Sequence, residues 1–225
     1  MKNLRPNRST LRRSAQGLVL IACLLTFSAC SLLNPVAAIP PTFYTLDSPR
    51  NAWPVSAPSP TASSKARPTL IISPPHASAG LDSTRIIYVQ SDHTLSYFAH
   101  NEWVDPPARM LGTLLVSALG SSGAFRAVVL SPSAATGELR LDTDLVRLQQ
   151  DFQTQPSRVQ FTLRATLVHD KSRRVLAWRT FTSEVDAPSN TPQGGVLAAN
   201  AAVQQVLEAL VEFMKNAPLD NIDIH

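Results

Sequence analysis

The chain has 225 residues, of which 44% are hydrophobic, and a formal net charge of +4. Five of its 20 Lys and Arg residues precede residue 30, where there is no acidic residue, so 15 basic residues face 16 acidic ones in the remainder. That remainder is about neutral, and the basic pI therefore does not indicate a nucleic-acid-binding protein. The two cysteines are Cys23 and Cys30, so we expect no disulfide and no thiolate metal site in the part that follows.

Residues 1–29 have the pattern of a secretory signal peptide. Basic residues precede an apolar run of about 11 residues, which is too short to span a membrane. The run ends in Phe27-Ser28-Ala29-Cys30, which resembles a bacterial lipobox, although Phe27 stands where Leu is usual. We expect cleavage before Cys30 and acylation of its thiol. Ser31, the next residue, resembles the sorting signal of lipoproteins that are directed to the outer membrane. Cleavage before Cys23 would leave an apolar run of about six residues, below the usual length. An uncleaved signal anchor with two inert cysteines is the alternative.

The next segment has the composition of a tether. Residues 31–41 are small and proline-containing, Phe43–Leu46 is a short β-prone stretch, and residues 51–68 carry four prolines among Ser, Ala and Thr. We therefore divide the chain into a signal peptide (1–29), a lipid anchor with a short strand and a Pro-rich tether (30–68), a folded domain (69–217) and a tail (218–225).

The first half of the folded domain mixes strands with one helix. Asp105 has the pattern of an N-cap, Pro106-Pro107 that of a first turn, and apolar residues then recur at helical spacing until Gly120. The strands expected around this helix are Leu70–Ser73, a hairpin of Arg85–Val89 and Thr94–Ala99, and Phe125–Leu130.

The second half predicts three sequential antiparallel strands and a last helix. Leu139–Leu145, Val159–Leu167 and Val175–Val185 alternate apolar and polar residues, and the alternation slips at Leu145-Val146, which indicates a β-bulge. Gly194-Gly195 precedes a helix with an apolar stripe over Ala199–Met214. The fold class expected is α/β, with a mixed, largely antiparallel sheet of about six or seven strands and two main helices packed on it.

The sequence shows no motif for catalysis, and we expect no catalytic residue, no metal and no cofactor. The histidines are scattered, without the i, i+4 spacing that places two imidazoles on one helix face. Asp142 and Asp144 share one face of a strand, but they alternate with apolar residues as on any solvated strand. An enzyme with an unrecognised site is the least favoured interpretation.

The order of motifs resembles the ABC-type transport auxiliary lipoproteins, the PqiC-like family. The features that carry the resemblance are the lipobox, Phe43-Tyr44-Thr45-Leu46, the Pro-rich gap, the hairpin, Asn101–Pro107 opening a helix and the late apolar helix. The resemblance implies a non-catalytic, outer-membrane lipoprotein that faces the periplasm. Its implied partners are an MCE-domain substrate-binding protein and an ABC permease and ATPase that move lipids or other hydrophobic compounds. The alternative is an envelope assembly or regulatory lipoprotein that activates another periplasmic machine.

Three aromatic residues are candidates for partner contact. Tyr97 and Phe98 are adjacent, so both cannot face the core of one strand. Trp103 either packs the hairpin onto the helix or anchors a partner, since aromatic residues are enriched at interface hot spots. We expect docking through the hairpin rather than an enclosed lipid pocket, outer-membrane contact through the acyl anchor, and no nucleic-acid partner. The sequence leaves a homo-oligomer open.

Overall fold

A computed structural model describes residues 39–47 and 67–217. The expected signal peptide, Cys30, most of the Pro-rich segment and the tail lie outside the described residues. The chain divides into two compact units, Met1–Pro40 and Pro41–His225. The fold described below is that of the second unit.

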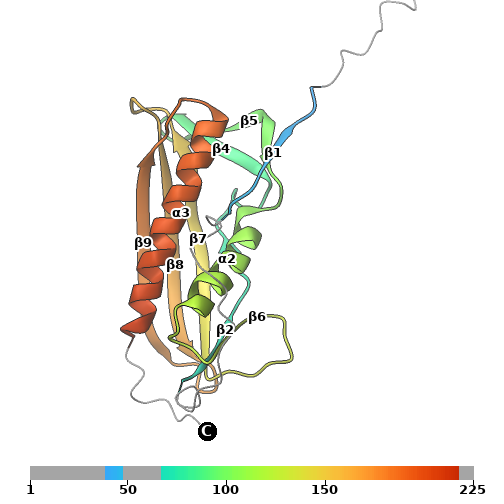
Figure 1. Ribbon diagram of the computed structural model, residues 1–225. Helices are drawn as coiled ribbons and strands as arrows, with labels where there is room; N and C mark the ends of the chain where they lie inside the picture. Colours follow the sequence, from blue (N-terminus) through green and yellow to red (C-terminus); the bar gives the residue numbers. More distant parts are fainter. Residues whose placement is uncertain (1–38, 48–66, 218–225) are drawn as a thin grey trace, which may run out of the picture. The chain divides into compact units, whose positions relative to one another are not determined.

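Nine strands and two helices form in the described part of this unit (Figure 1). In chain order they are β1 (Thr42–Tyr44), β2 (Thr69–Ile72), β3 (His76–Ala77), β4 (Arg85–Ser91), β5 (Thr94–Trp103), α2 (Pro107–Ser121), β6 (Ala127–Leu130), β7 (Leu139–Asp151), β8 (Arg158–His169), β9 (Val175–Asp186) and α3 (Pro192–Lys215).

The long strand β7 organises the sheet. One of its edges pairs with β8 in antiparallel fashion along the whole strand. Its other edge pairs in succession with β2, β3 and β4, all parallel. The sheet continues through β6 beyond β2, through β5 and β1 beyond β4, and through β9 beyond β8. The predicted α/β class is confirmed. The sheet has more strands than expected, because an element as short as β3 has no periodicity to recognise.

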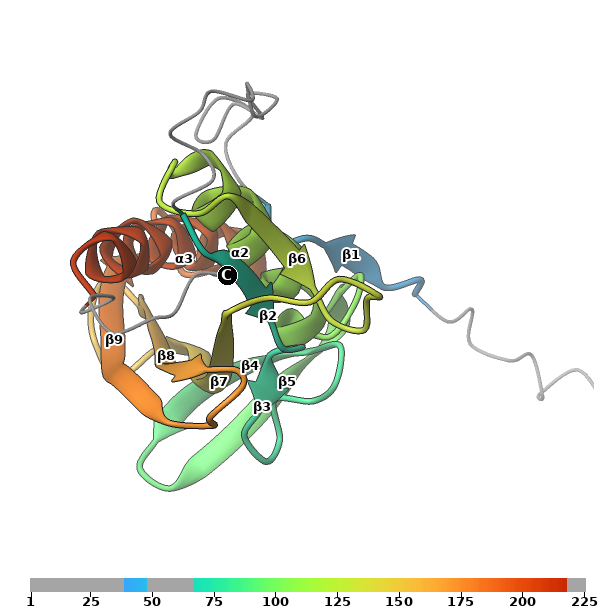
Figure 2. The same ribbon diagram turned by 90° about the horizontal axis from the view of Figure 1, so that it is seen from below.

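The two helices lie on one side of the curved sheet, as Figure 2 shows. Helix α3 packs over β8 and β9, and α2 packs over β2 and β6. The core fills the space between them, where Leu111, Leu115, Phe161 and Leu207 are fully buried. By length and hydropathy α3 could cross a membrane. Its apolar stripe, with Leu207 and Leu210 buried, instead faces this core.

The predicted bulge in β7 is confirmed. Leu145 is buried, and after it Leu148 rather than Arg147 continues the buried face. The register against β8 shifts between Leu145 and Arg147. The extra residue lets both halves of a 13-residue strand present their apolar side chains to the same core.

Both predicted helix starts need correction. The N-cap of α2 is Pro106, without a side-chain cap, and Asp105 instead forms an ion pair of 3.0 Å with Arg109. Helix α3 begins at Pro192, so Gly194 and Gly195 lie inside its first turn rather than before it. Thr191 caps this helix, its hydroxyl accepting a hydrogen bond from the Gly194 amide at 3.1 Å. At both starts a proline is the first helical residue, and the residue directly before it, Pro106 or Thr191, is the N-cap.

Candidate docking surface

The hairpin of β4 and β5 exposes an apolar pair beside a cation. Leu95 and Tyr97 are two residues apart on β5 and are 51% and 38% exposed. This spacing places them on the same face of the strand. The Arg85 guanidinium lies 4.8 Å from the centre of the Tyr97 ring. We call Arg85, Leu95 and Tyr97 the hairpin face.

Phe98, the neighbour of Tyr97, turns into an aromatic cluster instead. Its ring centre lies 4.5 Å from that of Tyr88 and 6.3 Å from that of Phe152. The Tyr88 and Phe152 rings meet edge to face at 5.7 Å. All three residues are half-buried. Phe98 therefore ties the hairpin to the residue that follows β7, and it is less open to a partner than Tyr97.

Trp103 lies in the core, which corrects the expectation of a partner contact there. Only 3% of the residue is exposed. It lines a small cavity of about 10 Å³ together with Ile86, Leu148, Gln150 and other residues of the hairpin, β7, β8 and α3. Such a volume has room for roughly one water molecule. Of the three aromatic candidates, Tyr97 is the most exposed, at 38%.

A second apolar pair lies at the β1 edge of the sheet, and the sequence analysis did not identify it. Phe43 is opposite Glu102 in the parallel pairing of β1 with β5, so Phe43, Glu102 and Val104 share the outer face. Phe43 is 60% exposed and Val104 59%. Tyr44 faces the other way, where its hydroxyl donates to Asn101 at 3.1 Å. The alternation of β1 implies that one of the two aromatic residues points outward, but not which.

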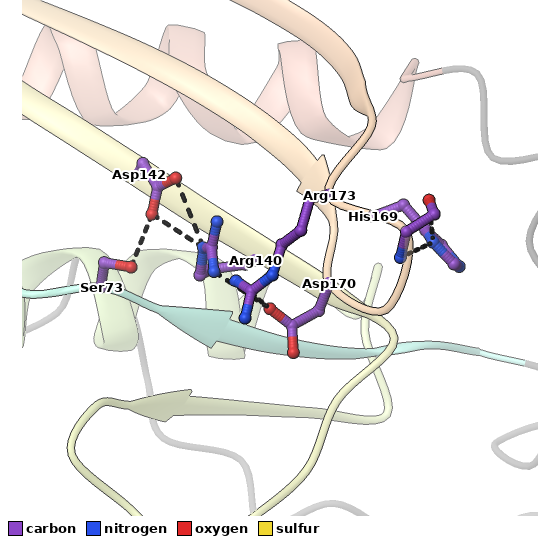
Figure 3. A network of polar contacts seen from close by, with 7 residues as sticks. Ser73, Arg140, Asp142, His169, Asp170 and Arg173 are labelled. Atoms are coloured by element: carbon purple, nitrogen blue, oxygen red, sulfur yellow. Dashed lines mark hydrogen bonds and ion pairs between the residues drawn. The ribbon is translucent and has the colours of Figure 1, made fainter.

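Of the two carboxylates considered for acid–base chemistry, Asp142 belongs to a structural network (Figure 3). Asp142 accepts a hydrogen bond from the Ser73 hydroxyl at 2.6 Å and pairs with the Arg140 Nε at 3.1 Å. Arg140 also reaches Asp170 at 3.2 Å, which pairs in turn with Arg173. The network joins the end of β2, strand β7 and the turn before β9. Asp142 is thus held by partners that secure three elements of the sheet.

Histidine and acidic side chains do not converge on a metal site in the part of the chain that the structure describes. His169, which stands at the end of β8, contacts the Ser172 hydroxyl of its own turn at 2.7 Å.

Comparison with known proteins identifies the family. Residues 44–211 match the model for the ABC-type transport auxiliary lipoprotein component. The crystal structure of protein XCC0632 from Xanthomonas campestris, a DUF330 protein, is 27% identical, with a TM-score of 0.63 over 76% of this chain and 92% of that one. A crystal structure of an uncharacterized protein, 15% identical, has a TM-score of 0.59 over 77% of this chain and 98% of that one, which shows a shared fold. No curated protein matches. Because the family model spans most of the residues, the chain belongs to the ABC-type transport auxiliary lipoprotein family.

Proposed function

We propose that this chain is a non-catalytic lipoprotein of the outer membrane that faces the periplasm and serves an ABC-type, MCE-associated transport system. Its cargo would be lipids or other hydrophobic compounds moving between membranes. Its partners would be the MCE-domain substrate-binding protein, and through it the ABC permease and ATPase. Membership of the transport auxiliary lipoprotein family supports this role.

The proposed docking role is supported by the location of the apolar side chains, which fill the core or lie at the surface. Most large apolar residues of both helices are buried against the sheet, and the cavity beside Trp103 measures about 10 Å³. Sites for drug-sized molecules measure roughly 300–1,000 Å³. A lipid therefore does not fit that cavity, and the remaining apolar side chains are at the surface. The protein acts by binding partners rather than by enclosing the cargo.

The hairpin face has the composition of a binding hot spot. Tyr and Arg are over-represented among residues whose truncation costs binding energy. Here Tyr97 and Arg85 are in contact, so both are partly ordered before a partner arrives. Leu95 supplies apolar area on the same face as Tyr97. Preordering lowers the entropic cost of binding.

The test is a binding measurement with a matched pair of variants. Leu95 on the hairpin and Leu197 on α3 are exposed to similar extents, 51% and 57%. The purified lipoprotein is titrated with the soluble domain of an MCE-domain protein from the same organism. We expect Leu95→Ala and Tyr97→Ala each to raise the Kd about tenfold without lowering the Tm, and Leu197→Ala to leave the Kd unchanged.

Two outcomes would contradict the proposal. Equal effects of Leu95→Ala and Leu197→Ala would remove the hairpin face as the docking site. Failure of the unmodified protein to bind the MCE-domain protein would remove the transport role, and activation of a different periplasmic machine would then favour the regulatory alternative.

A further inference from the structure

Strand β9 is a long edge of the sheet. It has 12 residues and, among the described parts of the chain, pairs only with β8. The other described strands that pair with a single neighbour, β1, β3 and β6, have three, two and four residues. Short edge strands are one way in which proteins prevent unwanted pairing, whereas a long edge presents a row of backbone donors and acceptors. Figure 2 shows β9 at the open end of the curved sheet.

Apolar side chains flank this edge on both of its faces. On the outer face, Trp178 is 67% exposed and Val175 is 53% exposed. On the helix side, Phe181 packs edge to face against Phe213 of α3, with ring centres 5.7 Å apart. Phe213 itself is only half-buried. A partner along β9 would therefore meet apolar surface above and below the plane of the sheet.

The charges along β9 are divided between its two ends. Arg174, directly before β9, and Arg179, in its first half, are exposed, and Glu184 and Asp186 lie in its second half. Both carboxylates pair with Arg158, at 3.1 and 2.9 Å. The side-chain hydrogen bonds that Arg158 makes to Asp186 and Glu184 raise the pKa of its guanidinium. One guanidinium between two carboxylates leaves the second half of the strand acidic, while the first half is basic.

We propose that two copies of this chain pair through their β9 strands, antiparallel and about a two-fold axis near Thr180, so that the sheet continues from one copy into the other. Thr180 is the sixth of the 12 residues of β9, next to its midpoint. An antiparallel arrangement about this axis brings Arg174 of each copy near Asp186 of the other, whereas Arg179 comes opposite Phe181. Like charges would meet in a parallel arrangement. The charge pattern is thus complementary to itself only in the antiparallel direction.

The register follows from the two faces of the sheet. Trp178 and Thr182 both lie on the outer face, opposite Thr166 and Thr162 of β8. An axis at Thr180 places Trp178 of one copy beside Thr182 of the other, which keeps outer residues with outer residues. A shift by one residue would set outer side chains against inner ones. Such an isologous contact closes on itself and gives a dimer.

Cysteine cross-linking in membranes of cells that make the full chain tests this pairing. Residues at the axis are about 4.5–5.5 Å apart between Cα atoms in an antiparallel pair, which is within the range of a disulfide. We expect Thr180→Cys to form a disulfide-linked dimer under mild oxidation. Leu95→Cys on the hairpin is the matched control and should stay monomeric. The unmodified chain, oxidised in the same way, measures how much dimer forms through Cys23 or Cys30 alone.

A second pair of variants tests the contact surface. Added to Thr180→Cys, Trp178→Lys should lower the cross-linked fraction at least tenfold, whereas Leu197→Lys, at a similarly exposed site on α3, should leave it unchanged. Light scattering of the chain in detergent should show a dimer for the unmodified protein and a monomer for Trp178→Lys. A monomeric Thr180→Cys protein, equal cross-linking at residues 95 and 180, or the same response to both lysine variants would overturn the proposal.

Discussion

Gly195, in the first turn of α3, lies directly against the side-chain amide of Gln150 on β7. A Cβ at this glycine would overlap the amide oxygen and carbon of Gln150. Gln150 is 2% exposed, and its Nε2 donates to the Ser157 hydroxyl at 2.9 Å and to the Thr191 carbonyl at 3.4 Å. The glutamine thus joins β7 to the start of α3, and the glycine leaves the space that it occupies.

Gly195→Ala should therefore destabilise the protein. Overpacking of a well-filled site costs about 1–3 kcal/mol in the free energy of unfolding, because the added methyl group must displace Gln150 from its hydrogen bonds. Gly120→Ala in α2 is the control, since its Cβ would meet nothing within 4 Å. Alanine there should stabilise by about 0.5–1 kcal/mol. Urea denaturation checks both values, and equal shifts for the two variants would show that the contact at Gly195 is unimportant.

Charges on the buried helix stripes should unfold the protein. Leu111 of α2 and Leu207 of α3 are both 0% exposed. Asp at either position places a carboxylate in the core at a cost of several kcal/mol, against a total stability of about 5–15 kcal/mol. Leu197→Asp, at an exposed position of α3, should leave the melting curve nearly unchanged. If Leu111→Asp and Leu207→Asp melt like Leu197→Asp, the assignment of these stripes to the core is wrong.

The choice of anchor residue is testable by labelling. Cys30→Ala should abolish incorporation of labelled fatty acid and leave a longer precursor, because the thiol of Cys30 is the proposed acceptor of the diacylglyceryl group. Cys23→Ala should be processed like the unmodified chain. Labelling that survives Cys30→Ala and disappears with Cys23→Ala would assign the anchor to the other cysteine.

Local patterns in the sequence predicted much of the fold. The apolar spacing that predicted both helices corresponds to their buried faces, and the slip at Leu145-Val146 indicated the bulge. The parallel pairings of β2 and β4 with β7 could not be read from local alternation, because register between distant strands depends on how the whole chain closes. The start of α3 was missed because Gly194-Gly195 was interpreted as a break before the helix, although Thr191-Pro192 is the local start signal.

The candidate surface was predicted in part. The adjacency of Tyr97 and Phe98 indicated that one of them leaves the core, and Tyr97 is the more exposed of the two. For Trp103, packing of the hairpin onto the helix was the favoured interpretation and partner contact the alternative, and the residue is 3% exposed. Trp178 lies in a strand whose alternation is ordinary, and its exposure depends on β9 being the last strand of the sheet.

The central claim is that this lipoprotein works by docking and does not carry a lipid in its own interior. Native mass spectrometry of the unit from Pro41 onward, produced in bacteria and exchanged out of a mild detergent, tests it most directly. The filled core and the 10 Å³ cavity beside Trp103 predict a spectrum of the polypeptide alone. Phospholipid retained in stoichiometric amount through gentle desolvation would contradict the claim and make the protein a carrier in its own right.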